Sequence, residues 1–162
     1  MNIRVRAAAG NDAARITAAL VGSWGSTVVV GHGTVYDLTA LPTLVAEHAG
    51  EIVGVLTYVL HSADGAALEV VSIDAIDRHR GVGSALLTAA VETARSRGCE
   101  RLWLVTTNDN LDALRFYQRR GLRIVGVTPG AVDAARAVKP AIPDTGDYGI
   151  PLRDELTLEL VL

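Results

Sequence analysis

The strongest constraint on the fold is an abrupt change of hydrophobic pattern in the middle of the chain. Residues 67–74 are almost continuously apolar, which predicts a central strand that is covered on both faces. From Gly83 to about Arg97 the apolar residues recur at helical spacing, which predicts an amphipathic helix. The chain must therefore turn sharply from strand to helix around Gly81 and Gly83.

The order of hydrophobic segments along the rest of the chain predicts a mixed α/β fold in a single domain, residues 1–162. Alternating and apolar runs predict further strands at 3–7, 43–48, 52–61, 101–106, 123–127 and 156–161. Helices are expected at about 12–21, 111–120 and 130–138, with residues 22–42 irregular and 139–151 a loop. The strands at 43–48, 52–61 and 67–74 follow one another closely, which indicates an antiparallel meander.

The overall charge and hydrophobic content exclude several classes of protein. The formal net charge of −3 argues against a nucleic-acid binder that relies on global positive charge. No apolar run approaches the roughly 18 residues of a membrane span, and the first residues do not have the pattern of a secretion signal. We therefore expect a cytoplasmic protein that binds neither nucleic acid nor membrane.

Metal and disulfide chemistry are also not expected. Cys99 is the single cysteine, so an internal disulfide framework or a cysteine zinc cluster cannot form. The four histidines are scattered and no two are four residues apart, so no metal site is predicted.

The turn from strand to helix has the properties of a phosphate-binding site. Gly81 and Gly83 let the backbone approach a ligand closely, and the first N–H groups of the following helix favour an anion. Arg78 and Arg80 could supply positive charge to a pyrophosphate. The alternative is a strained turn with no ligand.

Two other phosphate-binding motifs do not fit this turn. A Walker A loop needs a lysine before the serine, and Gly83 precedes Ser84 here. A dinucleotide-binding turn needs a third glycine where this chain has Leu86, and an acid at the end of the next strand, which ends Val105-Thr106-Thr107.

Two motifs together resemble those of the GNAT superfamily, the acyl-CoA-dependent N-acetyltransferases. Arg78-x-x-Gly81-x-Gly83 matches the family's pyrophosphate-binding signature, although Ala75 stands where many members have proline. The run from Asn110 to Leu122 resembles the family pattern Asn-x-x-Ala-x-x-x-Tyr-x-x-x-Gly-Phe, with leucine in place of the last phenylalanine. The resemblance covers about residues 44–127.

The resemblance implies a GNAT-like fold with a mostly antiparallel central sheet, splayed central strands and helices on both faces. It also implies direct transfer of an acetyl group from acetyl-CoA to an amine, with coenzyme A as product. The residues expected to bind the cofactor are Val71, Ser72, Ile73, Arg78, His79, Arg80, Gly81, Val82, Gly83, Ser84, Asn110, Ala113 and Tyr117. Those in the central strand would also supply N–H donors to the thioester oxygen.

Two side chains are candidates for acid and base catalysis. Tyr117 aligns with the family's usual general acid, which protonates the departing thiolate. Its alternative role is a core contact. Glu69 is the carboxylate inside the buried central strand, where desolvation would raise its pKa toward neutrality and make it a base. The alternative to a base is that Glu69 forms an ion pair with an arginine of a neighbouring strand.

The amine acceptor is expected near the two irregular segments. Trp24, His32, Tyr36 and Asp37 could form its pocket, with packing under a loop as the alternative for the tryptophan. The segment 139–155 is expected to fold back over the site or to form a homodimer contact. A small-molecule amine is the favoured substrate. The alternatives are a protein lysine or N-terminus and a non-catalytic acyl-CoA-binding module.

Overall fold

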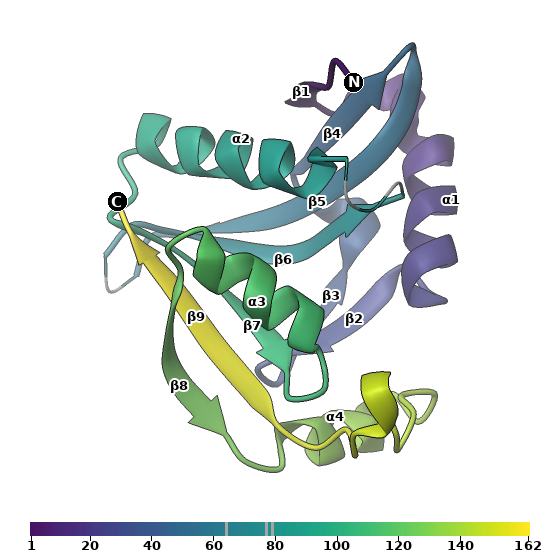
Figure 1. Ribbon diagram of the computed structural model, residues 1–162, viewed down its shortest axis with the longest axis vertical. Coiled ribbons are helices and arrows are strands. Elements are labelled where there is room, and N and C mark those ends of the chain that lie inside the picture. Colours follow the sequence, from purple (N-terminus) through teal and green to yellow (C-terminus); the bar gives the residue numbers. More distant parts are fainter. Residues whose placement is uncertain (64, 77, 79) are drawn as a thin grey trace. The chain divides into compact units, whose positions relative to one another are not determined.

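The apolar central segment forms strand β6 (Ala67–Ala75), which ends a run of four antiparallel strands. The computed structural model describes residues 1–63, 65–76, 78 and 80–162 (Figure 1). It contains two units, one of residues 1–29, 37–102 and 162 and the other of residues 30–36 and 103–161. The first unit holds the four strands in the order β1 (Arg4–Ala7), β4 (Thr43–His48), β5 (Glu51–His61) and β6, so the predicted meander is confirmed.

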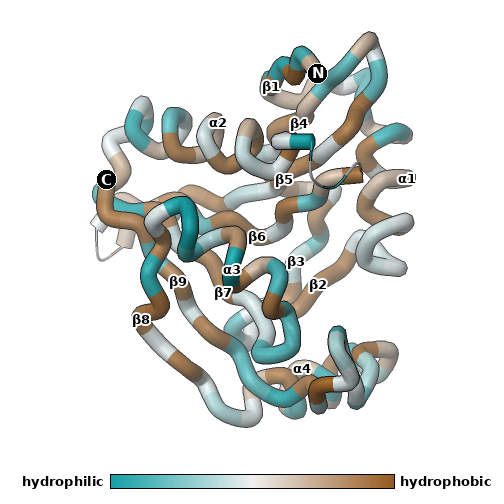
Figure 2. Tube along the Cα trace, in the orientation of Figure 1, coloured by the Kyte–Doolittle hydropathy of each residue, from teal (hydrophilic) through white to brown (hydrophobic). Residues whose placement is uncertain are grey.

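Two helices pack against this run of strands. Helix α1 (Ala13–Trp24) contacts β5 and runs three residues further than the predicted end at Val21, to a left-handed Gly25. Helix α2 (Val82–Ser96) contacts β4, β5 and β6, and Figure 2 shows hydrophobic and hydrophilic residues alternating along it. Its buried side chains are Val82, Leu86, Leu87, Ala90 and Ala94. The helical spacing predicts four of these together with Val91, which is half-buried, and does not include Val82.

The second unit contains most of β7 (Arg101–Thr107), together with β8 (Arg123–Thr128) and β9 (Glu155–Val161). Strand β9 lies between β7 and β8 and is antiparallel to β8. Two helices, α3 (Leu111–Arg119) and α4 (Ala131–Val138), complete this unit. The elements make a mixed α/β fold with mostly antiparallel strands, as predicted. None of the described helices has the length and apolar character needed to cross a bilayer.

The expectation of irregular structure throughout residues 22–42 is wrong. Strands β2 (Val28–Gly31) and β3 (Thr34–Asp37) pair as a hairpin, followed by the short 3-10 helix η2 (Leu38–Ala40). Both residues of the connecting turn have positive φ, 40° at His32 and 78° at Gly33. This geometry usually carries Asn-Gly or Asp-Gly, so a histidine in the first position hides the hairpin signal.

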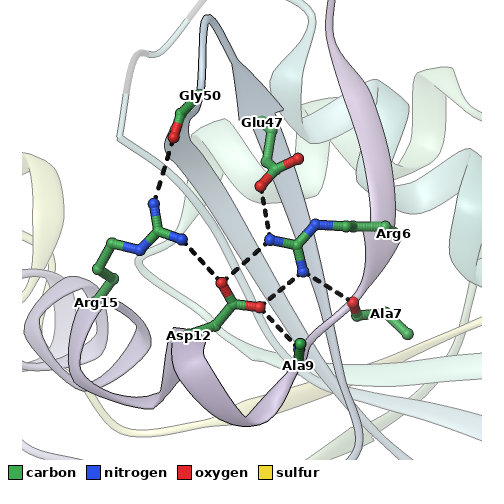
Figure 3. A network of polar contacts seen from close by, with 7 residues as sticks. All are labelled: Arg6, Ala7, Ala9, Asp12, Arg15, Glu47 and Gly50. Atoms are coloured by element: carbon green, nitrogen blue, oxygen red, sulfur yellow. Dashed lines mark hydrogen bonds and ion pairs between the residues drawn. The ribbon is translucent and has the colours of Figure 1, made fainter.

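The first residues are held by a network of charged groups (Figure 3). Asp12 is fully buried at the N-cap of α1, but its carboxylate makes no capping bond to that helix. It accepts hydrogen bonds from Arg6, Arg15 and the backbone N–H of Ala9. The Arg6 guanidinium holds the pKa of Asp12 well below its usual range, and that of Glu47 is lowered in the same way. The network joins β1 to β4 and to the start of α1.

Helix α2 approaches β5 at a position that leaves no room for a side chain. A Cβ on Gly54 would lie 2.5 Å from Cγ1 of Val82 and 3.0 Å from the backbone oxygen of Asp74. It would also lie 3.0 Å from Cδ1 of Leu86. Since Val82 and Leu86 belong to the first turns of α2, Gly54 fixes how closely the N-terminal end of the helix lies on the strands.

We predict that Gly54→Ala lowers stability by about 1–3 kcal/mol, because the added methyl overpacks the contact and one obstructing atom is backbone. Gly22→Ala is the control, since a Cβ there meets nothing within 4 Å and the position is inside α1. That change should be neutral or stabilise by up to about 1 kcal/mol. Thermal melting compares the two variants, and equal melting temperatures would contradict the close approach.

Candidate active site

The predicted phosphate-binding turn is found at the N-terminus of α2. Strand β6 ends at Ala75 and the helix begins at Val82, with Gly81 left-handed at φ 80°. The first helical backbone bond runs from the N–H of Ala85 to the carbonyl of Gly81, so the earlier N–H groups point out of the helix end. Because these donors and the helix dipole both favour an anion, the turn fits a pyrophosphate.

The arginines of this turn are exposed to solvent. Arg78 and Arg80 lie directly before the helix, where positive charge could reach a bound phosphate. His79 falls outside the residues that the structure describes, so its predicted role stays a prediction. The glycine at position 81 is needed for its backbone conformation, because other residues rarely adopt a positive φ.

Strand β6 contains a bulge at the point where N–H donors were expected. Its register against β5 pairs Ser72 with Thr57 and Val70 with Tyr58, so Val71 is an extra residue on β6. A bulge leaves its extra residue outside the regular ladder and redirects the backbone there. The Ser72 hydroxyl is buried and lies 2.6 Å from the Thr57 hydroxyl, which fixes the strand beside the bulge.

Glu69 is buried two residues before the bulge. The residue is 2% exposed, and its Oε2 lies 2.8 Å from Nε2 of His61 on β5. His61 is one partner of this buried carboxylate, and the ion pair with an arginine of a neighbouring strand stays an alternative. Sequence reasoning missed His61, although a tight connection between the two strands brings their adjoining ends together.

Helix α3 carries the second motif in the second unit. Asn110 is its N-cap, and the side-chain oxygen accepts a hydrogen bond from the N–H of Ala113 at 3.4 Å. The amide nitrogen of Asn110 donates to the hydroxyl of Thr106. One turn beyond Ala113, Tyr117 is buried, and this burial raises the pKa of its phenol above the usual range. The phenol therefore remains protonated throughout the neutral range.

The structure brings together two of the four predicted acceptor residues. Nε2 of His32 lies 3.0 Å from the hydroxyl of Tyr36, across the β2–β3 turn. The His32 ring also contacts the ring of Trp103, and its backbone N–H donates to Oε2 of Glu155. Sequence reasoning did not foresee that Trp103 and Glu155 contact His32, because each comes from a strand far along the chain.

The other two predicted acceptor residues belong to the first unit. Trp24 is the last residue of α1 and is 44% exposed. Asp37 caps η2, since its carboxylate accepts from the backbone N–H and the hydroxyl of Thr39. These contacts give Asp37 a local structural role, and its part in substrate binding stays a prediction.

The loop before β9 folds back onto the start of α3. The buried Asp109 accepts hydrogen bonds from the backbone N–H of Asp147 and from the hydroxyl of Thr107. A Cβ on Gly146 would overlap the Asp109 carboxylate. The loop also carries the short 3-10 helix η3 (Asp147–Gly149), within the region expected to have no regular structure.

Two further side chains hold the same loop. The side-chain oxygen of Asn108 accepts from the N–H groups of Arg153 and Asp154, and its nitrogen donates to the carbonyl of Pro151. The hydroxyl of Tyr148 donates to Asp112, in the first turn of α3. The loop is therefore attached to the helix end that carries the Asn110 motif. Whether it also forms a dimer contact stays a prediction.

The described residues contain no group of three or more histidine, cysteine, aspartate or glutamate side chains that could hold a metal ion.

Residues 23–122 match the profile of the acetyltransferase (GNAT) family. The uncharacterized protein YdhI of Bacillus subtilis is 37% identical over 140 residues, which cover 86% of each chain. Streptothricin acetyltransferase of Streptomyces lavendulae is 36% identical over 80 residues, or 48% of this chain and 42% of that protein. The chain belongs to the GNAT acetyltransferase family.

Solved structures agree with this assignment at the level of the fold. The IAA acetyltransferase of Bacillus cereus has a TM-score of 0.75 and 22% identity, covering 99% of this chain and 100% of its own. A GNAT acetyltransferase of Elizabethkingia anophelis with acetyl-CoA bound has a TM-score of 0.69 and 19% identity, covering 99% of both chains. The predicted fold and the predicted type of cofactor are both consistent with these neighbours.

We predict that Asp109→Ala loosens the loop before β9 by about 1–3 kcal/mol, because the backbone N–H of Asp147 and the hydroxyl of Thr107 lose their shared acceptor. Hydrogen exchange at residues 144–151 should become faster, while the strands of the first unit keep their protection. Gln118→Ala, which removes an exposed hydrogen bond to the carbonyl of Leu114 within α3, is the control and should leave this loop unchanged. Equal exchange in the two variants would show that Asp109 does not hold the loop.

Proposed function

We propose that the protein transfers an acetyl group from acetyl-CoA to a primary amine of a small molecule, by direct attack in a ternary complex. The main support is the organisation of one strand. Along β6, a buried carboxylate at Glu69, a bulge at Val71 and the anion-binding turn before α2 follow one another within a few residues. A base, redirected backbone donors and a phosphate site are three of the features that such a transfer needs.

When bound, acetyl-CoA would supply an acetyl group activated as a thioester. The N–H groups of Val82 and Gly83, with Arg78 and Arg80, would hold its pyrophosphate. The other residues of the turn and the face of α3 with Asn110, Ala113 and Tyr117 are proposed to complete the cofactor site. Backbone N–H groups around Val71 would stabilise negative charge on the thioester oxygen.

The proton steps are assigned to two side chains. Glu69 would take a proton from the acceptor's ammonium, directly or through water, so that the nitrogen lone pair becomes free to attack. As the new C–N bond forms and the C–S bond breaks, Tyr117 would donate its proton to the departing sulfur. The second proton that the nitrogen must lose to become an amide would pass to solvent, and solvent would return a proton to the phenolate. Burial keeps this phenol protonated, so the donor is available over the neutral range.

Two observations support a small-molecule acceptor: the name of one sequence relative and a cluster of side chains in the second unit. Streptothricin acetyltransferase, one of the sequence relatives, is named for a small molecule. The cluster of His32, Tyr36, Trp103 and Glu155 offers aromatic faces and a buried carboxylate, a combination that suits an ammonium group. We propose that this cluster contributes to acceptor binding, together with Trp24.

The proposed function is tested by a screen for thiol release from acetyl-CoA over polyamines, amino acids, aminoglycosides and peptides. We expect turnover with a small amine and an N-acetylated product in mass spectrometry. Turnover only with peptides would replace the small-molecule assignment by protein acetylation. Binding of acetyl-CoA with no turnover over the whole panel would favour a non-catalytic acyl-CoA-binding protein.

We predict that Tyr117→Phe lowers kcat by about 10²- to 10⁴-fold, the usual contribution of a positioned acid. The affinity for acetyl-CoA should change little, since the ring remains. In the wild type, kcat should not decline through ionisation of this phenol until the pH exceeds the ordinary tyrosine range near 10.

The matched control is Tyr58→Phe, which removes a buried phenol from β5 and should keep turnover within a few-fold of wild type. Steady-state kinetics and calorimetric titration with acetyl-CoA compare the variants. A Tyr117→Phe enzyme with wild-type kcat would remove Tyr117 from the acid role.

A further inference from the structure

The bulge at Val71 changes which side chains of β6 share a face. Alternate residues of β5 lie on one face and are paired with the polar residues of β6. These pairs are Val59 with Glu69, Thr57 with Ser72, and Val55 with Asp74. Because directly paired residues of antiparallel strands lie on the same face, the three polar side chains of β6 share it. Without the extra residue, Glu69 would lie on the opposite face from Ser72 and Asp74.

This polar face is the one turned away from α2. Gly54, next to Val55 on β5, faces α2, since a Cβ on it would meet side chains of the first turns of that helix. Val55 and Asp74 therefore lie on the other face. There the hydroxyl of Ser23, in the last turn of α1, donates a hydrogen bond to the Asp74 carboxylate. The proposed base and Asp74 thus lie on the α1 side of the strands, whereas the phosphate-binding turn leads into α2.

Asp74 differs from the other polar residues of this face in its exposure and in its partner. Glu69 and Ser72 are 2% and 3% exposed, whereas Asp74 is half-buried and reaches solvent. Within the described residues, the Asp74 carboxylate is bonded to a neutral hydroxyl, that of Ser23, and forms no ion pair with an arginine or lysine. A cation from solution can therefore pair with its negative charge. Trp24, which is proposed to contribute to acceptor binding, follows Ser23 directly in the chain.

We propose that Asp74 binds a second cationic group of the acceptor, so that the preferred substrate is a small molecule with two or more amines. This inference rests on the proposed function and makes its substrate class more specific. The nitrogen that attacks the thioester would lie beside the backbone of Val71, near Glu69. Asp74 is three residues further along the strand, or about 10 Å at about 3.3 Å per residue. An ammonium joined to the attacking amine by an alkyl chain of several carbons can span this distance.

The expected effect of Asp74 is on binding rather than on the chemical step. An ammonium remote from the reacting nitrogen keeps the same contact in the ground state and in the transition state. Interactions of this kind lower KM and leave kcat largely unchanged. The hydrogen bond from Ser23 would hold the carboxylate in place for the contact, which makes Ser23 a positioning residue.

Three diamines of increasing length test the proposal: putrescine, cadaverine and diaminooctane, each compared with the monoamine that has the same carbon chain. We expect the wild type to favour at least one diamine by about 10- to 100-fold in kcat/KM, the usual effect of a hydrogen bond to a charged group. In Asp74→Asn, which keeps an oxygen acceptor for the Ser23 hydroxyl, the KM for that diamine should rise by a similar factor and the preference should be lost. Asp74→Ser provides a second variant if the asparagine variant does not fold.

Glu92→Gln is the matched control, because it removes an exposed carboxylate from α2 and should keep the preference for the diamine. A wild type that acetylates monoamines and diamines equally well would overturn the inference. So would a folded Asp74 variant that keeps the preference, or one that loses activity equally toward both kinds of amine, since Asp74 would then only join β6 to α1. A wild type that acetylates no amine would contradict the proposed function itself, and the inference with it.

Discussion

The close approach of α2 to Gly54 is the constraint on which the first unit depends. Because position 54 has no side chain, Val82 and Leu86 lie directly on β5, and the first turn of the helix comes to rest at the end of β6. The backbone N–H groups of that turn are the proposed phosphate ligands. A larger residue at position 54 would push the helix away from the strands and move these N–H donors. The contact at Gly54 therefore affects both the packing of the core and the proposed binding of phosphate.

Strand β6 carries the other proposed site features of the first unit and leads to this end of α2. The bulge at Val71 redirects the backbone just before the turn, and the paired hydroxyls of Ser72 and Thr57 fix the strand beside it. Glu69 precedes the bulge, is enclosed and contacts His61. The proposed base, backbone donors and phosphate site thus follow one another along one strand, whose backbone sets their spacing.

Sequence patterns predicted the parts of this fold that depend on local periodicity. The meander, α2 and α3 follow from apolar spacing, and the turn between β6 and α2 follows from Gly81 and Gly83. The β2–β3 hairpin was missed, because His32 occupies a turn position that usually holds asparagine or aspartate.

The side-chain partnerships of the site could not be predicted in the same way. The contacts of Glu69 with His61 and of His32 with Glu155 depend on strand register and tertiary packing, which short-range patterns do not encode. Asp109 is similar, because its acceptor role becomes visible only when the loop before β9 is seen folded against it.

The central claim is that the turn before α2 forms part of an acetyl-CoA site, and thermal melting with acetyl-CoA tests it most directly. A ligand that binds only the folded state stabilises it by about 2.7 kcal/mol at a hundred times its dissociation constant. The account predicts a melting temperature that rises steadily with acetyl-CoA concentration and a smaller rise for a variant in which Arg78 and Arg80 are both alanine. A wild-type melting temperature that does not change at millimolar acetyl-CoA would contradict it.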